Sequence, residues 1–429
     1  MNVLWYYLIG FIIVWVLAFL LKDKFNITID GIVLMLKTDK LYNLIDRIAK
    51  LCPRVWTFIM NIGIPVGILF MIIMVVSLIL SLQLMFETPT VSLILPGVDI
   101  PGSPLYIPFG TGLIALATVL IIHEGGHGII ARVEGVSIKS VGLLLMVIIP
   151  GAFVEPDEDE VQKLNTISKL RIYSAGPVFN IILCIVSLVL AMLIGGFIAS
   201  GDVYTTDGME IISVVPASPA EGILTQGSVI TGVNNHTVKD YNSYVDSMKG
   251  LKVGDVVSIK TDSGTYDIKT SSNPNNASVA YIGLRANQHV VVTDSFASKY
   301  GTFIPWLLSQ LRELFNLMFL LNFAVGTFNL LPMKPLDGGL IFEELLKSEI
   351  TLNRRIEFNN TFNKLTRLFP MRIRCFLSKI FNSILNFLSK YTIPEKLADN
   401  IVKYTSTIFV FILVVLVVYG MLPGIIKMF

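Results

Sequence analysis

Long runs of apolar residues without a charged side chain recur along the chain, separated by segments that are richer in polar residues. A helix needs about 20 apolar residues to cross the hydrocarbon core of a bilayer. Runs of about this size or longer lie at 3–21, 55–86, 100–122, 172–201, 314–333 and 404–426. The pattern predicts a polytopic α-helical membrane protein with about six spans.

Three segments depart from this pattern. Residues 140–154 are apolar but too short to span, and their glycines and proline predict a re-entrant or interfacial β-like element. Residues 202–299 alternate apolar and polar positions between turn-forming residues, which predicts an inserted, β-rich soluble domain. Residues 371–389 place apolar residues at helical spacing with basic residues between them. They indicate an amphipathic helix on the inner leaflet, with a soluble helix packed on the chain's own core as the alternative.

Composition narrows the class of protein further. Hydrophobic residues make up 53% of the 429 residues and charged residues 15%, against about 25% charged in a typical globular protein. These values exclude a disordered chain, a coiled coil and an ordinary cytosolic enzyme. The net charge of +2 gives no reason to expect a nucleic-acid partner. The three cysteines lie far apart and form no recognisable framework.

Basic residues in the connections predict the orientation, because cytoplasmic loops carry an excess of Lys and Arg. Seven, five and twelve of them fall in 22–57, 132–171 and 332–403, and none in 87–99. We therefore expect these three segments in the cytoplasm, with both termini and the β-rich domain outside it. The first apolar run lacks the basic start and the cleavage site of a signal peptide, so we expect it to be an anchor.

The strongest chemical signal is the sequence His123-Glu124-Gly125-Gly126-His127 near the end of the third apolar run. Positions four apart share a helix face, so both imidazoles can reach one zinc ion while Glu124 activates water beside it. Ionisable residues inside a span are costly and favour a functional explanation. The alternative is a pair of buried histidines bound to backbone carbonyls, with Glu124 paired to Arg132.

Catalytic zinc takes three protein ligands, so a third is needed. Asp337 follows the fifth run, in the segment Asn329-Leu-Leu-Pro332-Met-Lys-Pro335-Leu-Asp337-Gly-Gly. The prolines end the helix and the glycines allow a tight turn, so the carboxylate can point back toward the histidines. A helix exit capped by an aspartate is the structural alternative.

Together these motifs resemble the site-2 proteases, zinc metalloproteases that cut substrates within the membrane. HEGGH matches the family's HExxH, the segment from Asn329 to Gly338 matches its motif ending in Leu-Asp-Gly, and residues 174–180 (SAGPVFN) resemble a third. The resemblance implies that His123, His127 and Asp337 bind zinc. It further implies that Glu124 is the catalytic base.

The same resemblance places Asn180 and Asn329 near the metal, where they would position the scissile carbonyl. Hydrogen bonding between helices is the alternative for both amides. It also implies partners: transmembrane protein substrates, either intact or already shortened by another protease, within the lipid bilayer.

The β-rich segment resembles a PDZ domain of the bacterial type, through Ile211–Pro216, Ala217–Ala220, Gly227–Ile230 and Val233–Asn235. In that family a short loop binds a peptide carboxylate through backbone N–H groups. Ile282, Gly283 and Leu284 are the candidate loop, with a strand-end turn as the alternative.

We therefore expect an intramembrane zinc endopeptidase of the site-2 type that serves regulated intramembrane proteolysis. The alternatives are a metal-ion transporter and an inactive membrane scaffold that presents a PDZ domain. The expected parts are anchor spans and a cytoplasmic loop (1–104), the HEGGH part of the catalytic core (105–201), the extracytoplasmic PDZ-like domain (202–299), the LDGG part of the core (300–345), and a cytoplasmic amphipathic segment with the last span (346–429).

Overall fold

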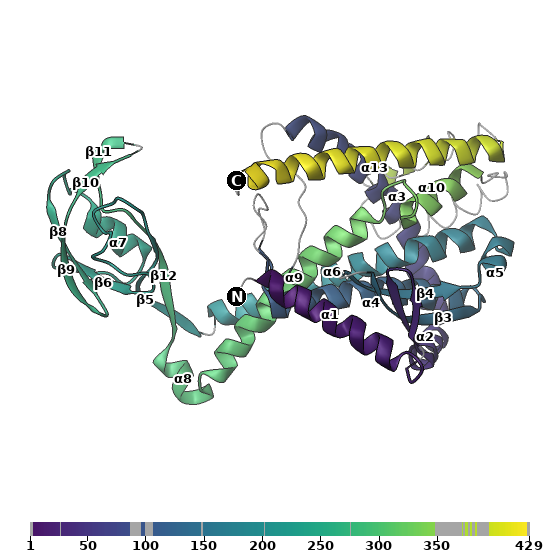
Figure 1. The fold of residues 1–429 in the computed structure, drawn as a ribbon, viewed down its shortest axis with the longest axis horizontal. Coiled ribbons are helices and arrows are strands. Elements are labelled where there is room, and N and C mark those ends of the chain that lie inside the picture. Colours follow the sequence, from purple (N-terminus) through teal and green to yellow (C-terminus); the bar gives the residue numbers. More distant parts are fainter. Residues whose placement is uncertain are drawn as a thin grey trace. The chain divides into compact units, whose positions relative to one another are not determined.

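The computed structural model divides into two compact units. The first, here called the membrane unit, comprises Met1–Ala191 and Glu313–Phe429, and the second, the β unit, comprises Met192–Arg312 (Figure 1). The structure describes residues 3–25, 27–85, 96–98, 106–146, 149–200, 202–274, 276–347 and 394–426, with isolated positions between 371 and 383. The amphipathic helix predicted at 371–389 therefore lies largely outside the described residues.

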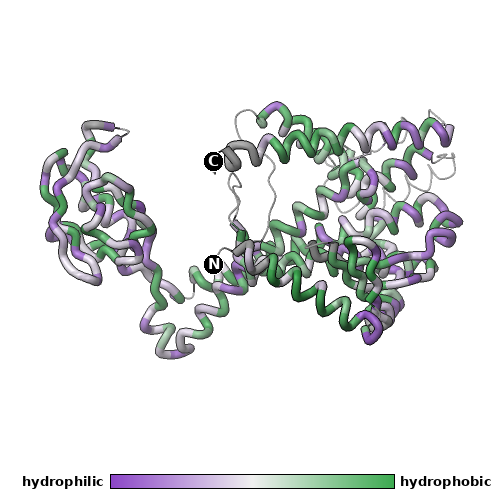
Figure 2. Tube along the Cα trace, in the orientation of Figure 1, coloured by the Kyte–Doolittle hydropathy of each residue, from purple (hydrophilic) through white to green (hydrophobic). Residues whose placement is uncertain are grey.

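Within the described residues, five helices are long and apolar enough to cross a membrane. They are α3 (Pro53–Leu84), α4 (Phe109–Val133), α6 (Thr166–Ser200), α9 (Phe303–Phe328) and α13 (Glu395–Ile426). The shorter α1 (Val3–Leu21) covers the first predicted span, and Figure 2 shows the apolar stretches in green. The expectation of a polytopic membrane protein with about six spans is confirmed.

Helix α4 is displaced along the chain from the predicted span at 100–122. It begins after Pro108, because a proline fits at a helix start but not in the turns that follow. It ends at Val133, where Gly135 adopts a positive φ of 86°. The HEGGH sequence thus lies inside the helix and not at its end, which gives both histidines a regular helical backbone.

A four-stranded antiparallel sheet packs against α4, and its strands run in the order β1-β2-β3-β4. The four strands are β1 Ile27–Asp30, β2 Val33–Lys37, β3 Ile138–Met146 and β4 Ile149–Pro156. The hairpin of β3 and β4 lies where the β-like element was predicted. Strands β1 and β2 were not predicted, and β4 is left as an edge of the sheet.

The core of the membrane unit lies where helix α4 packs against α2 (Asp39–Leu51), α3 and α6. Ile130, Ala131 and Ala175 are completely buried there. A Cβ on Gly126 would come 3.0 Å from the carbonyl oxygen of Ala175, so this glycine allows α4 and α6 to approach closely. The close approach fixes the two histidines of α4 against α6.

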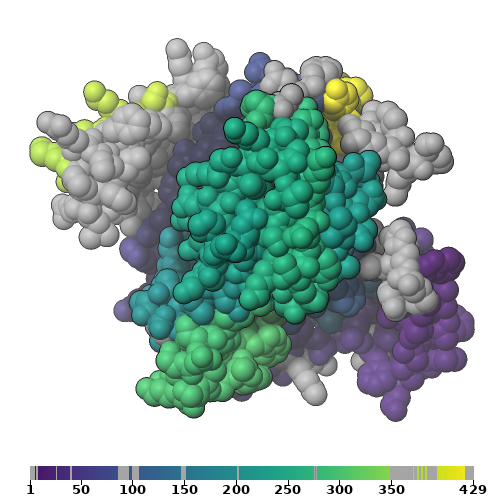
Figure 3. All heavy atoms as spheres, turned by 90° about the vertical axis from the view of Figure 1, so that its left-hand side faces the viewer, coloured from purple at the N-terminus to yellow at the C-terminus, as the bar shows by residue number. Residues whose placement is uncertain are grey.

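The β unit is built on a sheet with strand order β12-β5-β6-β8-β9 (Figure 1). Figure 3 draws the atoms of this unit in teal and green. The elements are β5 Tyr204–Val214, β6 Val229–Val233, β7 His236–Thr237, α7 Tyr241–Met248, β8 Val256–Thr261, β9 Gly264–Lys269, β10 Ser271–Asn273, β11 Asn276–Tyr281, β12 Leu284–Val292 and α8 Asp294–Tyr300. Asp240 caps α7, and the backbone N–H of Ser243 lowers the pKa of its carboxyl. The predicted β-rich insert is confirmed.

Candidate active site

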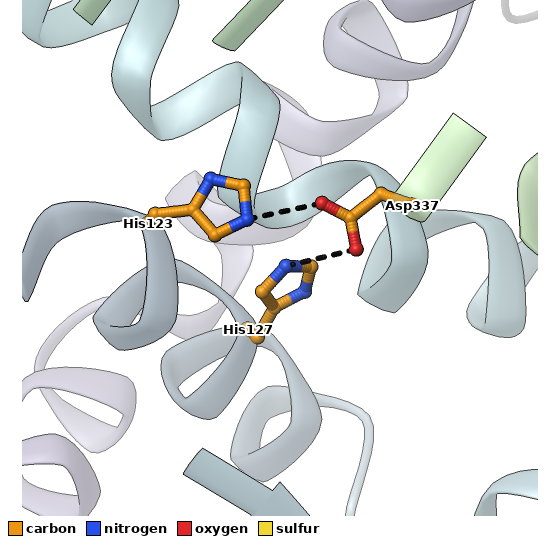
Figure 4. Close-up of side chains that lie close together, drawn as sticks. All are labelled: His123, His127 and Asp337. Carbon is orange, nitrogen blue, oxygen red and sulfur yellow. Dashed lines mark ion pairs between the residues drawn. The ribbon is translucent and has the colours of Figure 1, made fainter. Parts of the chain in front are cut away.

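Three side chains from two distant parts of the chain converge in the membrane unit (Figure 4). Nε2 of His123 lies 3.1 Å from Oδ2 of Asp337, and Nε2 of His127 lies 3.3 Å from Oδ1 of the same carboxylate. All three side chains are largely buried, with exposed fractions of 11%, 13% and 14%. The two predicted motifs therefore meet, although more than 200 residues separate them in the sequence.

The histidines and Glu124 owe their placement to α4. His123 and His127 are one helical turn apart on the same face of the helix. Glu124 lines the same cavity, and its Oε2 accepts a hydrogen bond of 3.2 Å from the backbone N–H of Val154 in β4. The edge strand thus holds one oxygen of the carboxylate that we expect to act as the base.

Asp337 is the first residue of α10 (Asp337–Lys347), where a negative charge is favoured by the helix dipole. The loop that leads to it folds tightly, because the N–H of Gly338 donates to the carbonyl of Asn329 over 2.7 Å. A Cβ on Gly338 or Gly339 would collide with the backbone at 330–334. The glycine pair is therefore needed to turn Asp337 toward α4.

The geometry fits zinc. The three ligand atoms lie within 4.8 Å of one another, and tetrahedral ligands about 2.0–2.1 Å from zinc lie roughly 3.3 Å apart. Nδ1 of His127 lies 2.8 Å from the carbonyl oxygen of Ile172, an acceptor, so in the neutral ring Nδ1 carries the hydrogen and Nε2 holds a lone pair. A lone pair facing a carboxylate is repulsive unless a cation lies between them.

One face of α6 forms the wall behind both imidazoles. Ile172, Gly176 and Asn180 follow one another at intervals of four residues, so they line up along this face. Gly176 lies between the two histidines, and a Cβ on it would come 2.7 Å from Nε2 of His123. Nδ2 of Asn180 lies 3.2 Å from Nδ1 of His123. The contacts of Ile172 and Gly176 with the histidines were not predicted. They arise from the packing of α6 against α4, and no sequence motif indicates them.

A cavity of about 1300 Å³ opens onto this cluster. Both histidines, Glu124 and Asp337 line it, and so does Asn329. Asn180 is completely buried and is not among the described residues that line the cavity. The two asparagines that were predicted to position substrate therefore differ in their access to it.

In the acidic run at 155–160, the side chains of Asp157 and Glu160 have structural partners. Asp157 caps α5 (Glu158–Lys163) through the N–H groups of Asp159 and Glu160. The N–H of Glu160, together with Lys139, lowers the pKa of the Asp157 carboxyl. Glu160 accepts hydrogen bonds from both the N–H and the hydroxyl of Ser137.

The candidate loop of the β unit lies between β11 and β12, with Gly283 at a positive φ of 83°. The carbonyl of Ile282 accepts the N–H of Ala220, and the carbonyl of Gly283 accepts the N–H of Val215. Leu284 begins β12 and lies opposite Val214 of β5. These contacts fix the loop conformation, and its binding of a peptide stays a prediction.

Several known proteins resemble this chain. An uncharacterized protein of Methanocaldococcus jannaschii is 28% identical over 350 residues, covering 79% of this chain and 86% of that protein. A putative zinc metalloprotease of Clostridium perfringens is 26% identical over 57% of this chain and 88% of its own length. A membrane-bound transcription factor site-2 protease homolog of Arabidopsis thaliana is 28% identical over 32% of this chain, but over only 27% of its own length.

Among solved structures, the PDZ domain of an SdrC-like protein of Listeria innocua is 30% identical over 19% of this chain and 97% of its own, with a TM-score of 0.18. The profile described as Peptidase family M50 matches residues 111–371, which is more than half of the chain and includes both motifs of the metal cluster. The predicted resemblance to the zinc proteases of the site-2 type is thereby confirmed, and the chain belongs to peptidase family M50.

Proposed function

We propose that this protein hydrolyses peptide bonds of transmembrane proteins at the His123, His127 and Asp337 cluster. These three side chains would hold zinc, and Glu124 would act as the general base. The observation that carries the proposal is the convergence of three ligand atoms within 4.8 Å, on a cavity that Glu124 also lines. Two imidazoles and one carboxylate are a common ligand set of catalytic zinc and leave its fourth position open.

Zinc supplies a Lewis acid that polarises the scissile carbonyl and lowers the pKa of a coordinated water to about 7. Glu124 takes the proton from the attacking water and returns it to the leaving nitrogen. The N–H of Val154 holds Oε2 of Glu124 in place, which leaves the other oxygen to accept that proton. Asn329 lines the cavity and would position the scissile carbonyl, as its motif predicts.

We infer that the substrate binds in an extended conformation along β4. The N–H of Val154 points toward Glu124 and thus away from β3, where Val154 lies opposite Val141. Ala152, two residues earlier, lies opposite Leu143, so its N–H points the same way. An edge strand with outward backbone groups beside a catalytic carboxylate is suited to add a substrate strand. Cleavage then requires local unwinding of the substrate helix.

The orientation belongs to this proposal as well. The distribution of basic residues favours an active site that opens toward the cytoplasm and a β unit outside it. The sequence pattern of the β unit favours a PDZ domain, whose ligand would be a free peptide end. Such a domain would select substrates by the size or the end of their extracytoplasmic part, including substrates already shortened by another protease.

The function is tested with Glu124→Gln in purified protein. The amide cannot accept a proton but leaves all three ligands in place, so zinc content should stay at the native level. Cleavage of a spanning peptide should fall by a factor on the order of 100 to 10,000. An undiminished rate would overturn the assignment of the base, and cleavage that persists after complete removal of zinc would overturn the metal mechanism.

A further inference from the structure

We infer that Asn180 is a positioning residue: its amide oxygen accepts a hydrogen bond from Nδ1 of His123 and so fixes the tautomer that binds zinc through Nε2. This inference rests on the metal site proposed above. It assigns Asn180 a role toward the metal ligand in place of the contact with substrate that its motif predicts.

The first observation is the lack of access to substrate. Asn180 has an exposed fraction of 0%, whereas Asn329 is among the described residues that line the active-site cavity. Gly326 of α9 packs against Asn180 from another side, since a Cβ on this glycine would come 3.0 Å from Cβ of Asn180. Asn180 is therefore enclosed between α4, α6 and α9, and among the described residues of the active site its side-chain amide contacts His123.

The second observation is the hydrogen-bond chemistry of His123. A neutral imidazole has one N–H and one lone pair, so a zinc ion on Nε2 requires the hydrogen on Nδ1. The neighbour of Nδ1 must then be an acceptor. The Asn180 amide lies 3.2 Å from Nδ1, and its Oδ1 is buried without a hydrogen-bond partner. A rotation of the side-chain amide by 180° exchanges Oδ1 and Nδ2, which have nearly the same shape. Oδ1 of Asn180 then accepts a hydrogen bond from Nδ1–H of His123, so neither atom is left without a partner.

The third observation is the matching arrangement at His127. There the carbonyl of Ile172 accepts the hydrogen of Nδ1 and leaves Nε2 for the metal. Ile172 and Asn180 lie two turns apart on one face of α6, with Gly176 between them against both rings. Helix α6 thus offers one acceptor to each zinc-binding histidine. Partners of this kind set the ring orientation and the basicity of a metal ligand, and their loss typically weakens metal binding about 10–100-fold.

The test measures the zinc dissociation constant of the full-length protein in detergent by competition with a chelator. Asn180→Leu removes the acceptor and should weaken zinc binding about 10–100-fold. Asn180→Asp keeps an acceptor of the same shape and should bind zinc at least as tightly as the native protein. The visible absorption of the cobalt-substituted protein should change in Asn180→Leu, because His123 no longer holds its orientation.

Asn322 provides the matched control. It is also completely buried, in α9, and its Nδ2 donates to the carbonyl of Met318 in its own helix. Asn322→Leu should leave zinc affinity and the cobalt spectrum unchanged, so a loss limited to Asn180→Leu cannot come from removing a buried amide in general. Native zinc affinity in a folded Asn180→Leu, or weaker binding in Asn180→Asp, would overturn the inference.

One further variant separates this inference from the proposed function. His123→Ala should abolish tight zinc binding if the metal site is correct. Loss of zinc in His123→Ala combined with native affinity in Asn180→Leu would leave the metal site intact and overturn only the role of Asn180. Native affinity in both variants would overturn the metal site itself. If Asn180→Leu cleaves more slowly but binds zinc with unchanged affinity, Asn180 acts on the substrate, as its motif predicts, and the inference is overturned.

Discussion

Gly176 packs directly against the imidazole of His127, so that a Cβ on this glycine would overlap Nε2, the atom that faces Asp337. The same Cβ would come 2.7 Å from Cε1 and Nε2 of His123. The absence of a side chain at this one position of α6 therefore makes room for both imidazoles.

The first prediction follows from this contact. Gly176→Ala should displace both rings from Asp337, and zinc affinity should fall by more than the roughly 10–100-fold that loss of a supporting hydrogen bond costs. Gly196→Ala is the control on the same helix, because a Cβ at Gly196 meets nothing within 4 Å. Chelator competition on both proteins checks the prediction. Equal zinc affinity in the two variants would contradict the close packing.

The second prediction concerns the third ligand. Asp337→Asn keeps the shape of the side chain but removes its charge, so zinc affinity should fall by at least about 100-fold, above the range for residues that only support a ligand. Asp157→Asn should bind zinc normally, since asparagine caps a helix about as well as aspartate. Metal analysis after dialysis measures both. Full zinc in Asp337→Asn would place the third ligand elsewhere.

The third prediction tests the edge strand. Proline has no N–H, and at an edge it is tolerated where that N–H points away from the sheet. Ala152→Pro should therefore spare the pairing of β3 and β4 but weaken substrate binding, raising KM for a spanning peptide several-fold while zinc content stays native. The control is Ala152→Val, which keeps the N–H. A native KM in Ala152→Pro would contradict strand addition.

The parts of the site that could be predicted from the sequence are those contained in short motifs. Spacing within α4 placed His123 and His127 on one face, and the Asp337 motif followed from its prolines and glycines. The sequence did not predict β1 and β2, because both strands are short and β2 joins the sheet by pairing with β3, about 100 residues further along the chain. The motif predicted Asn180 near the metal, and its amide lies 3.2 Å from Nδ1 of His123. Its burial depends on Gly326 of α9, which no local pattern connects with it.

The last prediction joins orientation with selection of substrates. In a protein whose cysteines Cys52, Cys184 and Cys375 have been replaced, a single cysteine at the exposed Ser263 of the β unit should react with an impermeant reagent from outside the cell. One at the exposed Lys163, which follows the acidic run, should react only after the membrane is opened. If only the cysteine at position 163 is labelled in intact cells, the orientation is the opposite of the one proposed.

The same arrangement predicts that the β unit filters substrates without taking part in catalysis. Tyr204 and Val292 lie opposite each other at the start of β5 and the end of β12, so a two-residue turn can replace residues 205–291 without moving either strand end. This deletion should leave cleavage of a short spanning peptide within about twofold of the native rate, because His123, Glu124, His127 and Asp337 all lie in the membrane unit. It should also relax discrimination against substrates with large extracytoplasmic domains, which the β unit would otherwise exclude. Both cleavage rates are measured with the two substrates in the same vesicles. The model of a filter separate from the catalytic site is contradicted if the folded deletion variant cleaves neither substrate, or if it still rejects the large one.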